Sequence, residues 1–282
     1  MRVWRYLLLF ASILTAADKP IVIAHRGGAA LWPENTIAAF HHAVTLGVDM
    51  LEFDMNVTAD NRIVIHHDST VNSEVCRPSA GSQVKPGPIH LLTLNDILRF
   101  DCGSSERPNS PNYKTSPAQK MPTLDLFLSA VKASNLPLLG ETKMPPAGTE
   151  SVTPEKFVEL IDTIVRKHNV EDRFILQSSD YRTTDAMKKR NPKIKICLLN
   201  ARRFKPGYLE LARRHGATHL MLRADDATAD EIRQLQSAGI KILSGTANAV
   251  DQWKKYVELG MDGILTDDPL GLMQFLGRRI GK

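Results

Sequence analysis

Short apolar runs alternate with segments of helical periodicity along most of this chain. The runs have the length of buried parallel strands and lie at residues 21–24, 50–57, 136–139, 173–177, 194–199, 218–222, 240–243 and 263–265. A 3.6-residue period predicts helices at residues 33–46, 124–133, 154–168, 181–190, 206–214, 229–237 and 250–259, and Asn35 or Thr36 is the expected N-cap of the first. Strands and helices in this alternation predict an α/β fold, the (β/α)8 TIM barrel. A doubly wound open sheet is the alternative, but the GxGxxG motif that often follows its first strand and a P-loop are both missing.

One extra strand is predicted beside the second barrel strand. Residues 62–67 follow residues 50–57 too closely for a parallel crossover, so we expect an antiparallel hairpin that turns at residues 59–61. A two-residue loop at 59–60 would set His67 opposite Glu52, and a loop at 60–61 would set His67 opposite Asp54. Both registers predict His67 beside the carboxylates, with His66 on the opposite face.

Residues 69–120 lose this periodicity and are rich in Pro, Ser, Gly and Asn. We interpret them as an insertion subdomain over the site, with one short helix at residues 94–100 that Thr93 opens. Cys76 and Cys102 lie here, and in an oxidising compartment they could form a disulfide, although the spacing also allows two free thiols. Cys197 lies in an apolar run and is predicted to be a buried strand residue.

Residues 1–17 have the pattern of a secretory signal peptide. A basic start precedes an apolar run, and small residues precede a predicted cut before Asp18, which leaves residues 18–282 as the mature chain. The apolar run is shorter than the roughly 20 residues of a membrane-spanning helix, which disfavours an uncleaved anchor. We therefore expect a secreted or periplasmic protein with no stable membrane insertion after signal cleavage.

The net charge does not point to a nucleic-acid partner. The formal charge is +5, and removal of Arg2 and Arg5 with the leader lowers it by two. The remaining basic residues stand beside acidic ones in helical segments, which indicates solvated helix faces.

Acidic residues lie at the carboxyl ends of predicted strands, the edge at which barrel enzymes carry their chemistry. Glu52, Asp54 and Glu141 offer hard oxygen ligands without a thiolate, a set that suits Mg²⁺ or Ca²⁺. A single buried acid would more commonly pair with a nearby basic residue. Three converging carboxylates would repel one another without a cation, so the group predicts a metal site.

Histidines and basic residues lie at the same edge. His25 and His67 could serve as general base and general acid, because their unperturbed pKa values lie near neutrality. Arg26 and Lys143 could stabilise a phosphoryl group. With the carboxylates, these residues indicate in-line phosphoryl transfer. Further polar residues are expected at this edge: Gln177, Ser178, Thr246, Asn248, Thr266 and Asp267.

These residues stand in motifs that resemble the glycerophosphodiester phosphodiesterase family. The matching segments are AHRGG at 24–28, PENT at 33–36, AAFHHAVTLGVDMLEFD at 38–54, IVIHHD at 63–68, MPTL at 121–124, ETK at 141–143 and DGILTDDP at 262–269. HRG or HD alone would be a weak signal, but the whole set in this order is specific.

The resemblance implies a metal-dependent TIM barrel that cleaves a small-molecule glycerophosphodiester to glycerol 3-phosphate and an alcohol. A neighbouring glycerol hydroxyl or water could attack phosphorus. The implied roles are an acid–base pair, His25 and His67; phosphate contacts, Arg26 and Lys143; and ligands of Mg²⁺ or Ca²⁺, Glu52, Asp54 and Glu141. The sequence makes no prediction of the oligomeric state.

Two other activities stay open at this point: a phosphodiester lyase that retains a cyclic phosphate product, and a non-catalytic binding module. The complete carboxylate set favours hydrolysis, and the filled catalytic positions disfavour a silent module. Two positions depart from the family pattern. Gly245, in SGTAN at 244–248, stands where an aromatic residue is common, and SS at 178–179 stands where SF is common. We therefore expect a wider pocket or a weaker grip on glycerol.

Overall fold

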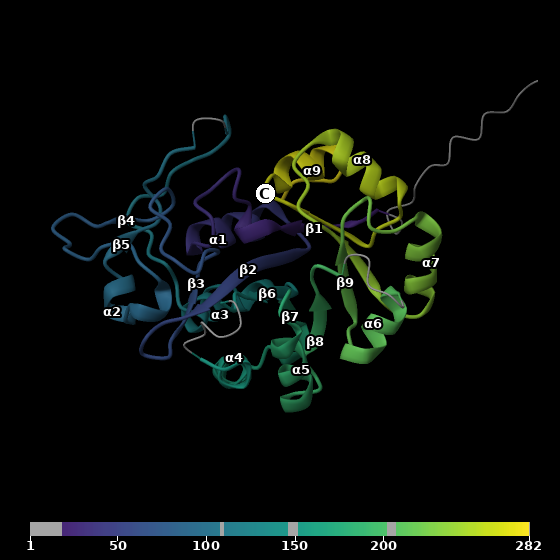
Figure 1. Cartoon of the computed structure of the whole chain (residues 1–282). Coiled ribbons are helices and arrows are strands. Elements are labelled where there is room, and N and C mark those ends of the chain that lie inside the picture. Colours follow the sequence, from purple (N-terminus) through teal and green to yellow (C-terminus); the bar gives the residue numbers. More distant parts are fainter. Residues whose placement is uncertain (1–18, 108–109, 146–151, 202–206, 282) are drawn as a thin grey trace, which may run out of the picture.

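The structure, a computed structural model, describes residues 19–107, 110–145, 152–201 and 207–281. Figure 1 shows strands gathered at the centre with helices around them. The predicted signal peptide, residues 1–17, lies outside the described residues. Within the described ranges, no helix is long and apolar enough to cross a membrane.

Eight parallel strands close into a barrel. In chain order they are β1 (Ile21–Ala24), β2 (Met50–Val57), β6 (Leu138–Thr142), β7 (Phe174–Ser178), β8 (Lys195–Leu198), β9 (His219–Leu222), β10 (Lys241–Ser244) and β11 (Gly263–Thr266). Neighbours in this order pair with one another, and β1 pairs with both β11 and β2. An open sheet leaves its first and last strands unpaired on one side, so this closure confirms the TIM barrel and excludes the doubly wound alternative.

Helices cover the outside of the barrel between successive strands. α1 (Ile37–Leu46) begins after Thr36, one of the two predicted N-caps, whose hydroxyl accepts the N–H of Ala39 at 3.2 Å. Asn35, the other candidate, has a left-handed φ of 57° and lies before the cap. α9, which the sequence pattern did not predict, begins where Asp268 accepts the N–H of Gly271. α9 spans Pro269–Phe275, and the other barrel helices are α3 (Leu124–Ala130), α4 (Pro154–His168), α5 (Tyr181–Arg190), α6 (Tyr208–His215), α7 (Ala229–Ser237) and α8 (Val250–Glu258).

The barrel interior is filled by one apolar layer. Each barrel strand contributes one residue to it: Ile23, Met50, Leu139, Ile175, Cys197, Met221, Leu243 and Leu265. The prediction that Cys197 is a buried strand residue is confirmed. A second apolar layer lies between strands and helices, where Phe53 of β2 packs on Phe127 of α3. The inner layer closes the barrel beneath the site, as expected of a packed core rather than a pore.

The extra strand β3 (Ile63–Ile65) forms the predicted antiparallel hairpin with β2, but both predicted registers are wrong. Met55 pairs with Ile65 and Val57 with Ile63, so the turn contains three residues rather than two. Thr58 closes it, because its backbone N–H donates to the Arg62 carbonyl at 2.9 Å and its hydroxyl accepts the Arg62 N–H at 2.9 Å. β3 ends before His67, so strand alternation does not decide where that side chain points.

Residues between β3 and α3 form a small unit beside the barrel (Figure 1). β4 (Arg77–Pro78) pairs antiparallel with β5 (Phe100–Asp101), and a disulfide joins Cys76 to Cys102. The short helices η3 (Ile89–Leu91) and α2 (Leu94–Ile97) lie between these strands. Thr93 caps α2 as predicted, but the helix ends before residue 100 because Phe100 enters β5. Residues of this unit share an apolar core of their own, which includes Ile89, Ile97 and Phe100.

Candidate active site

A cavity of about 660 Å³ opens at the carboxyl ends of the barrel strands. Met221 and Leu265 of the inner apolar layer are part of its lining. Six of the seven residues that the sequence proposes for the site line it: His25, Arg26, Glu52, His67, Glu141 and Lys143. The seventh, Asp54, is fully buried and forms an ion pair with Lys143. The structure therefore brings all seven together.

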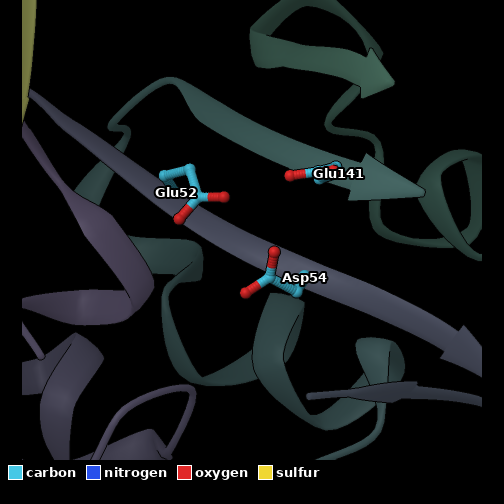
Figure 2. A group of neighbouring side chains, drawn as sticks. All are labelled: Glu52, Asp54 and Glu141. Atoms are coloured by element: carbon cyan, nitrogen blue, oxygen red, sulfur yellow. The ribbon is translucent and has the colours of Figure 1, made fainter. Parts of the chain in front are cut away.

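The three acidic residues come from two adjacent strands. Glu52 and Asp54 share one face of β2 because strand side chains alternate, and the β2–β6 register sets Glu141 beside Asp54. Figure 2 shows the three carboxylates turned toward one another. One oxygen from each lies within 4.8 Å of the others. This spacing could hold one cation.

The pKa values of Glu52 and Asp54, with the contacts of Asp54, bear on whether a metal cation fits among the three carboxylates. Burial and the Asp54 charge raise the pKa of Glu52 to about 8. Although burial acts in the opposite direction, Lys143 and Arg26 hold the pKa of Asp54 well below its ordinary value. Asp54 Oδ1 is buried and lies 3.0 Å from Lys143 Nζ, without hydrogen-bond geometry to any described group. A buried oxygen without a hydrogen bond and a carboxyl that resists ionisation both favour a divalent cation among hard oxygen ligands.

Each of the two site histidines is held by a carboxylate. His25 Nδ1 lies 2.6 Å from Asp267 Oδ1, and His67 Nδ1 lies 2.7 Å from Asp68 Oδ1. A carboxylate accepts, so each Nδ1 carries the hydrogen and each Nε2 is left for proton transfer. His25 Nε2 lies 4.0 Å from Glu52 Oε2. Although burial acts in the opposite direction, Glu52 and Asp267 raise the pKa of His25.

Arg26 is positioned by an unusual backbone turn directly after β1. Its φ of 52° is left-handed, and its backbone N–H donates to Glu52 Oε2 at 2.9 Å. Gly27 continues the turn with a φ of 82°, and a Cβ there would lie 2.9 Å from Ala39 Cβ, so only glycine fits. The Arg26 guanidinium donates to Glu34 Oε1 at 2.9 Å, and its Nε lies 3.5 Å from Asp54. The turn in the HRGG segment therefore places the positively charged Arg26 guanidinium beside the site carboxylates.

A match to a protein-family model identifies the family of this chain. The model described as the glycerophosphoryl diester phosphodiesterase family matches residues 25–270. The chain belongs to this family. A glycerophosphodiester phosphodiesterase from Caldanaerobacter subterraneus subsp. tengcongensis is 28% identical over 261 residues, which cover 92% of this chain and 98% of that protein.

Solved structures show the same fold at lower identity. A proposed glycerophosphoryl diester phosphodiesterase from Silicibacter pomeroyi has a TM-score of 0.84 at 22% identity, covering 91% of this chain and 93% of that one. An Oleispira antarctica phosphodiesterase in complex with the product sn-glycerol-3-phosphate has a TM-score of 0.77 at 22% identity, covering 92% and 97%.

Several residues that hold the site together in this phosphodiesterase-family chain have no role that the sequence predicts. Asn35 Nδ2 donates to Asp54 Oδ2 at 2.9 Å, and Glu34 holds Arg26. Asp267, which holds His25, accepts from Asn248 Nδ2 at 2.6 Å. All of them lie in motifs or strand ends that the sequence singled out. Their contacts cross between loops, which strand periodicity does not describe.

The remaining histidines near these motifs do not face the cavity. His66 is buried, its Nε2 accepts the N–H of Asn72 at 3.2 Å, and burial lowers its pKa. His42 of α1 packs against Trp32. These contacts give His66 and His42 structural roles.

The two departures from the family pattern lie in different places. Gly245 lines the cavity, and a Cβ there would have Arg223 Cγ at 3.5 Å and Tyr256 Oη at 3.8 Å as its nearest neighbours. Ser179 instead lines a separate hollow beside Tyr181. Only the change at Gly245 can therefore alter the shape of the site cavity.

Proposed function

We propose that this protein hydrolyses glycerophosphodiesters to sn-glycerol 3-phosphate and an alcohol. The observation that carries the proposal is the pair of histidine–carboxylate contacts facing one cavity that also holds three carboxylates, Arg26 and Lys143. Membership of the family supports the activity, and the relative bound to sn-glycerol-3-phosphate supports this class of product.

Glu52, Asp54 and Glu141 would hold Mg²⁺ or Ca²⁺. A bound divalent cation supplies Lewis-acid polarisation of a phosphoryl oxygen. Arg26 and Lys143 lie at the same carboxylates, so they would contact the remaining phosphoryl oxygens and stabilise the charge that develops there.

The two histidines would transfer the protons. As the attacking oxygen bonds to phosphorus, its proton passes to Nε2 of one histidine. The P–O bond to the alcohol breaks, and Nε2 of the other histidine gives its proton to the leaving oxygen. Asp267 and Asp68 keep each ring in the tautomer that leaves Nε2 available. The attacking oxygen is that of a neighbouring glycerol hydroxyl, which yields a cyclic phosphate that water then opens, or that of water itself.

Export of the protein is part of the proposal. Residues 1–17 have the signal-peptide pattern, and the Cys76–Cys102 disulfide supports an oxidising compartment. Mass spectrometry of the protein recovered from the exported fraction should find a chain that begins at Asp18. A cytosolic protein that retains Met1 would contradict export.

A substrate panel with metal add-back tests the proposed activity. Residues 18–282 are stripped of metal with a chelator and supplied with Mg²⁺ or Ca²⁺, and release of sn-glycerol 3-phosphate is followed with glycerophosphocholine, glycerophosphoethanolamine and glycerophosphoglycerol. Glu141→Gln removes one carboxylate charge from the site, and Glu258→Gln on exposed α8 is its matched control.

We expect metal-dependent turnover by the wild type and Glu258→Gln, and little by Glu141→Gln. Phosphorus NMR of the products separates the alternatives. Accumulation of a cyclic phosphate would indicate a lyase, and the absence of turnover on every diester with either metal would indicate a binding module.

A further inference from the structure

A row of three charged side chains joins the insertion to the site. Arg107, from the unit between β3 and α3, forms an ion pair with Glu34, and Glu34 Oε1 accepts from Arg26 at 2.9 Å. Arg26 in turn lies beside Asp54. We call these residues the Arg107–Glu34–Arg26 row.

Glu34 is the centre of the row. Its side chain is only 7% exposed, so its charge needs partners, and each of its two oxygens meets a different arginine. Among the described residues, Glu34 is the only hydrogen-bond partner of the Arg26 guanidinium, whose buried Nε has none. The direction of Arg26 therefore depends on the direction of Glu34.

Arg107 is fixed by contacts of its own. Its Nη1 donates to the Ala29 carbonyl at 2.9 Å, and its guanidinium lies 5.8 Å from the centre of the Tyr113 ring. Close by, the Lys114 N–H donates to the Leu31 carbonyl at 2.9 Å. The insertion thus docks on the loop that follows β1, the loop that carries Arg26.

The row also sets the charge that Arg26 presents. A carboxylate paired with Arg26 alone would offset most of its charge, whereas Glu34 divides its charge between Arg26 and Arg107 and so offsets the Arg26 charge less. Arg26, Glu34, His67 and Arg107 line one hollow of about 460 Å³ together with the acidic Asp68, Glu74 and Glu106, and Arg26 and His67 line the site cavity as well. Arg26 is therefore the member of the row that faces the place where a phosphoryl group would bind.

We propose that Arg107 is a positioning residue for the reaction: through Glu34 it orients Arg26 and keeps the Arg26 charge available to the phosphoryl group. The inference rests on the proposed function. It gives the insertion a role in the chemistry although, among the described residues, Arg107 pairs with Glu34 and not with the three site carboxylates.

Two variants test Arg107, and a third serves as their control. Arg107→Met removes the charge, Arg107→Lys keeps the charge but not the two-point contact to Glu34 and Ala29, and Arg77→Met, on exposed β4, is the matched control in the same insertion. We expect Arg107→Met to raise KM about tenfold with a smaller change in kcat, because ground-state phosphate binding is weakened. Arg107→Lys should lie between Arg107→Met and the wild type. Arg77→Met should match the wild type.

A double-mutant cycle separates positioning from a general structural effect. If Arg107 acts through Arg26, Arg107→Met should change kcat/KM of the Arg26→Lys protein by less than about twofold. Calorimetric titration of sn-glycerol 3-phosphate should show the same non-additivity in Kd. Thermal unfolding of each variant shows that the fold is retained.

The outcomes are distinct. Additive losses in the cycle, or an Arg107→Met protein that matches Arg77→Met, would overturn the inference while leaving the proposed function intact. A wild-type protein that turns over no diester would overturn both.

Discussion

Glu52 offers a test of the metal site that does not depend on activity. Its side chain is 1% exposed, and burial with the Asp54 charge raises its pKa to about 8 in the metal-free protein. Because the folded-state pKa lies above the unfolded value near 4.5, folding is favoured at low pH, and this contribution is lost as the pH rises through 8. The difference between these two pKa values is equivalent to a loss of at most roughly 5 kcal/mol of unfolding free energy, of which roughly 3 kcal/mol falls between pH 5.5 and pH 8.

The neighbouring groups act in both directions. Burial lowers the pKa of His66, and that of His219 to about 4, so these two histidines contribute more stability as the pH rises and oppose the trend. The pKa of His25 is raised by Glu52 and Asp267 against the effect of burial, so His25 also contributes less stability as the pH rises. The pKa of Asp54 is lowered by Lys143 and Arg26 against burial. Its contribution is therefore constant at any pH well above its ordinary value of 3.8.

Urea denaturation of chelator-treated protein at pH 5.5 and pH 8 measures the effect. We expect a lower free energy of unfolding at pH 8, and we expect added Mg²⁺ or Ca²⁺ to stabilise the protein more at pH 8 than at pH 5.5, because the cation binds the ionised carboxylate. Glu52→Gln should flatten the pH dependence, whereas the surface control Glu258→Gln should keep it. A pH dependence in Glu52→Gln equal to that of the wild type would refute the reasoning, because the opposing histidines His66 and His219 are present in both proteins.

Three further changes have definite expected results. Asp267→Asn should lower kcat about 10²- to 10⁴-fold, because the amide no longer fixes the His25 tautomer, and an unchanged pH–rate profile would argue against this contact. Reduction of the Cys76–Cys102 disulfide should lower the free energy of unfolding by about 3 kcal/mol in chemical denaturation, and an unchanged midpoint would contradict a stabilising crosslink. Cys197 should resist thiol reagents until the chain unfolds, because its burial in the barrel interior raises the pKa of its thiol; rapid labelling of the native protein would be inconsistent with that packing.

The barrel could be predicted from the sequence because its strands carry short apolar runs and every barrel helix except α9 shows a helical period. The placement of Glu52 and Asp54 on one face follows from the two-residue period of β2 alone. Their approach to Glu141 follows from the parallel register of β2 with β6, which a barrel imposes.

The position of His67 was predicted for a reason that the structure does not support. The turn at residues 59–61 is set by the Thr58–Arg62 contacts, and β3 ends at Ile65, so His67 reaches the cavity from a loop. A one-residue change in a turn reverses the faces of a strand, and such local hydrogen bonds are not visible in the apolar pattern.

Contacts between distant loops were the least predictable part of the site. Asp267 lies 242 residues from His25 along the chain, and Arg107 meets Glu34 across 73 residues. No periodicity links such pairs. They depend on how the insertion and the strand-end loops fold over the barrel, which is a property of the whole structure.

The measurement that tests the account most directly is the release of sn-glycerol 3-phosphate by the wild type, His25→Ala and His67→Ala in the presence of Mg²⁺ or Ca²⁺. Each variant keeps the carboxylates, Arg26 and Lys143, so thermal unfolding should show a retained fold. The account predicts turnover by the wild type and its loss in both variants across several diesters. Turnover at the wild-type rate by either histidine variant would contradict it.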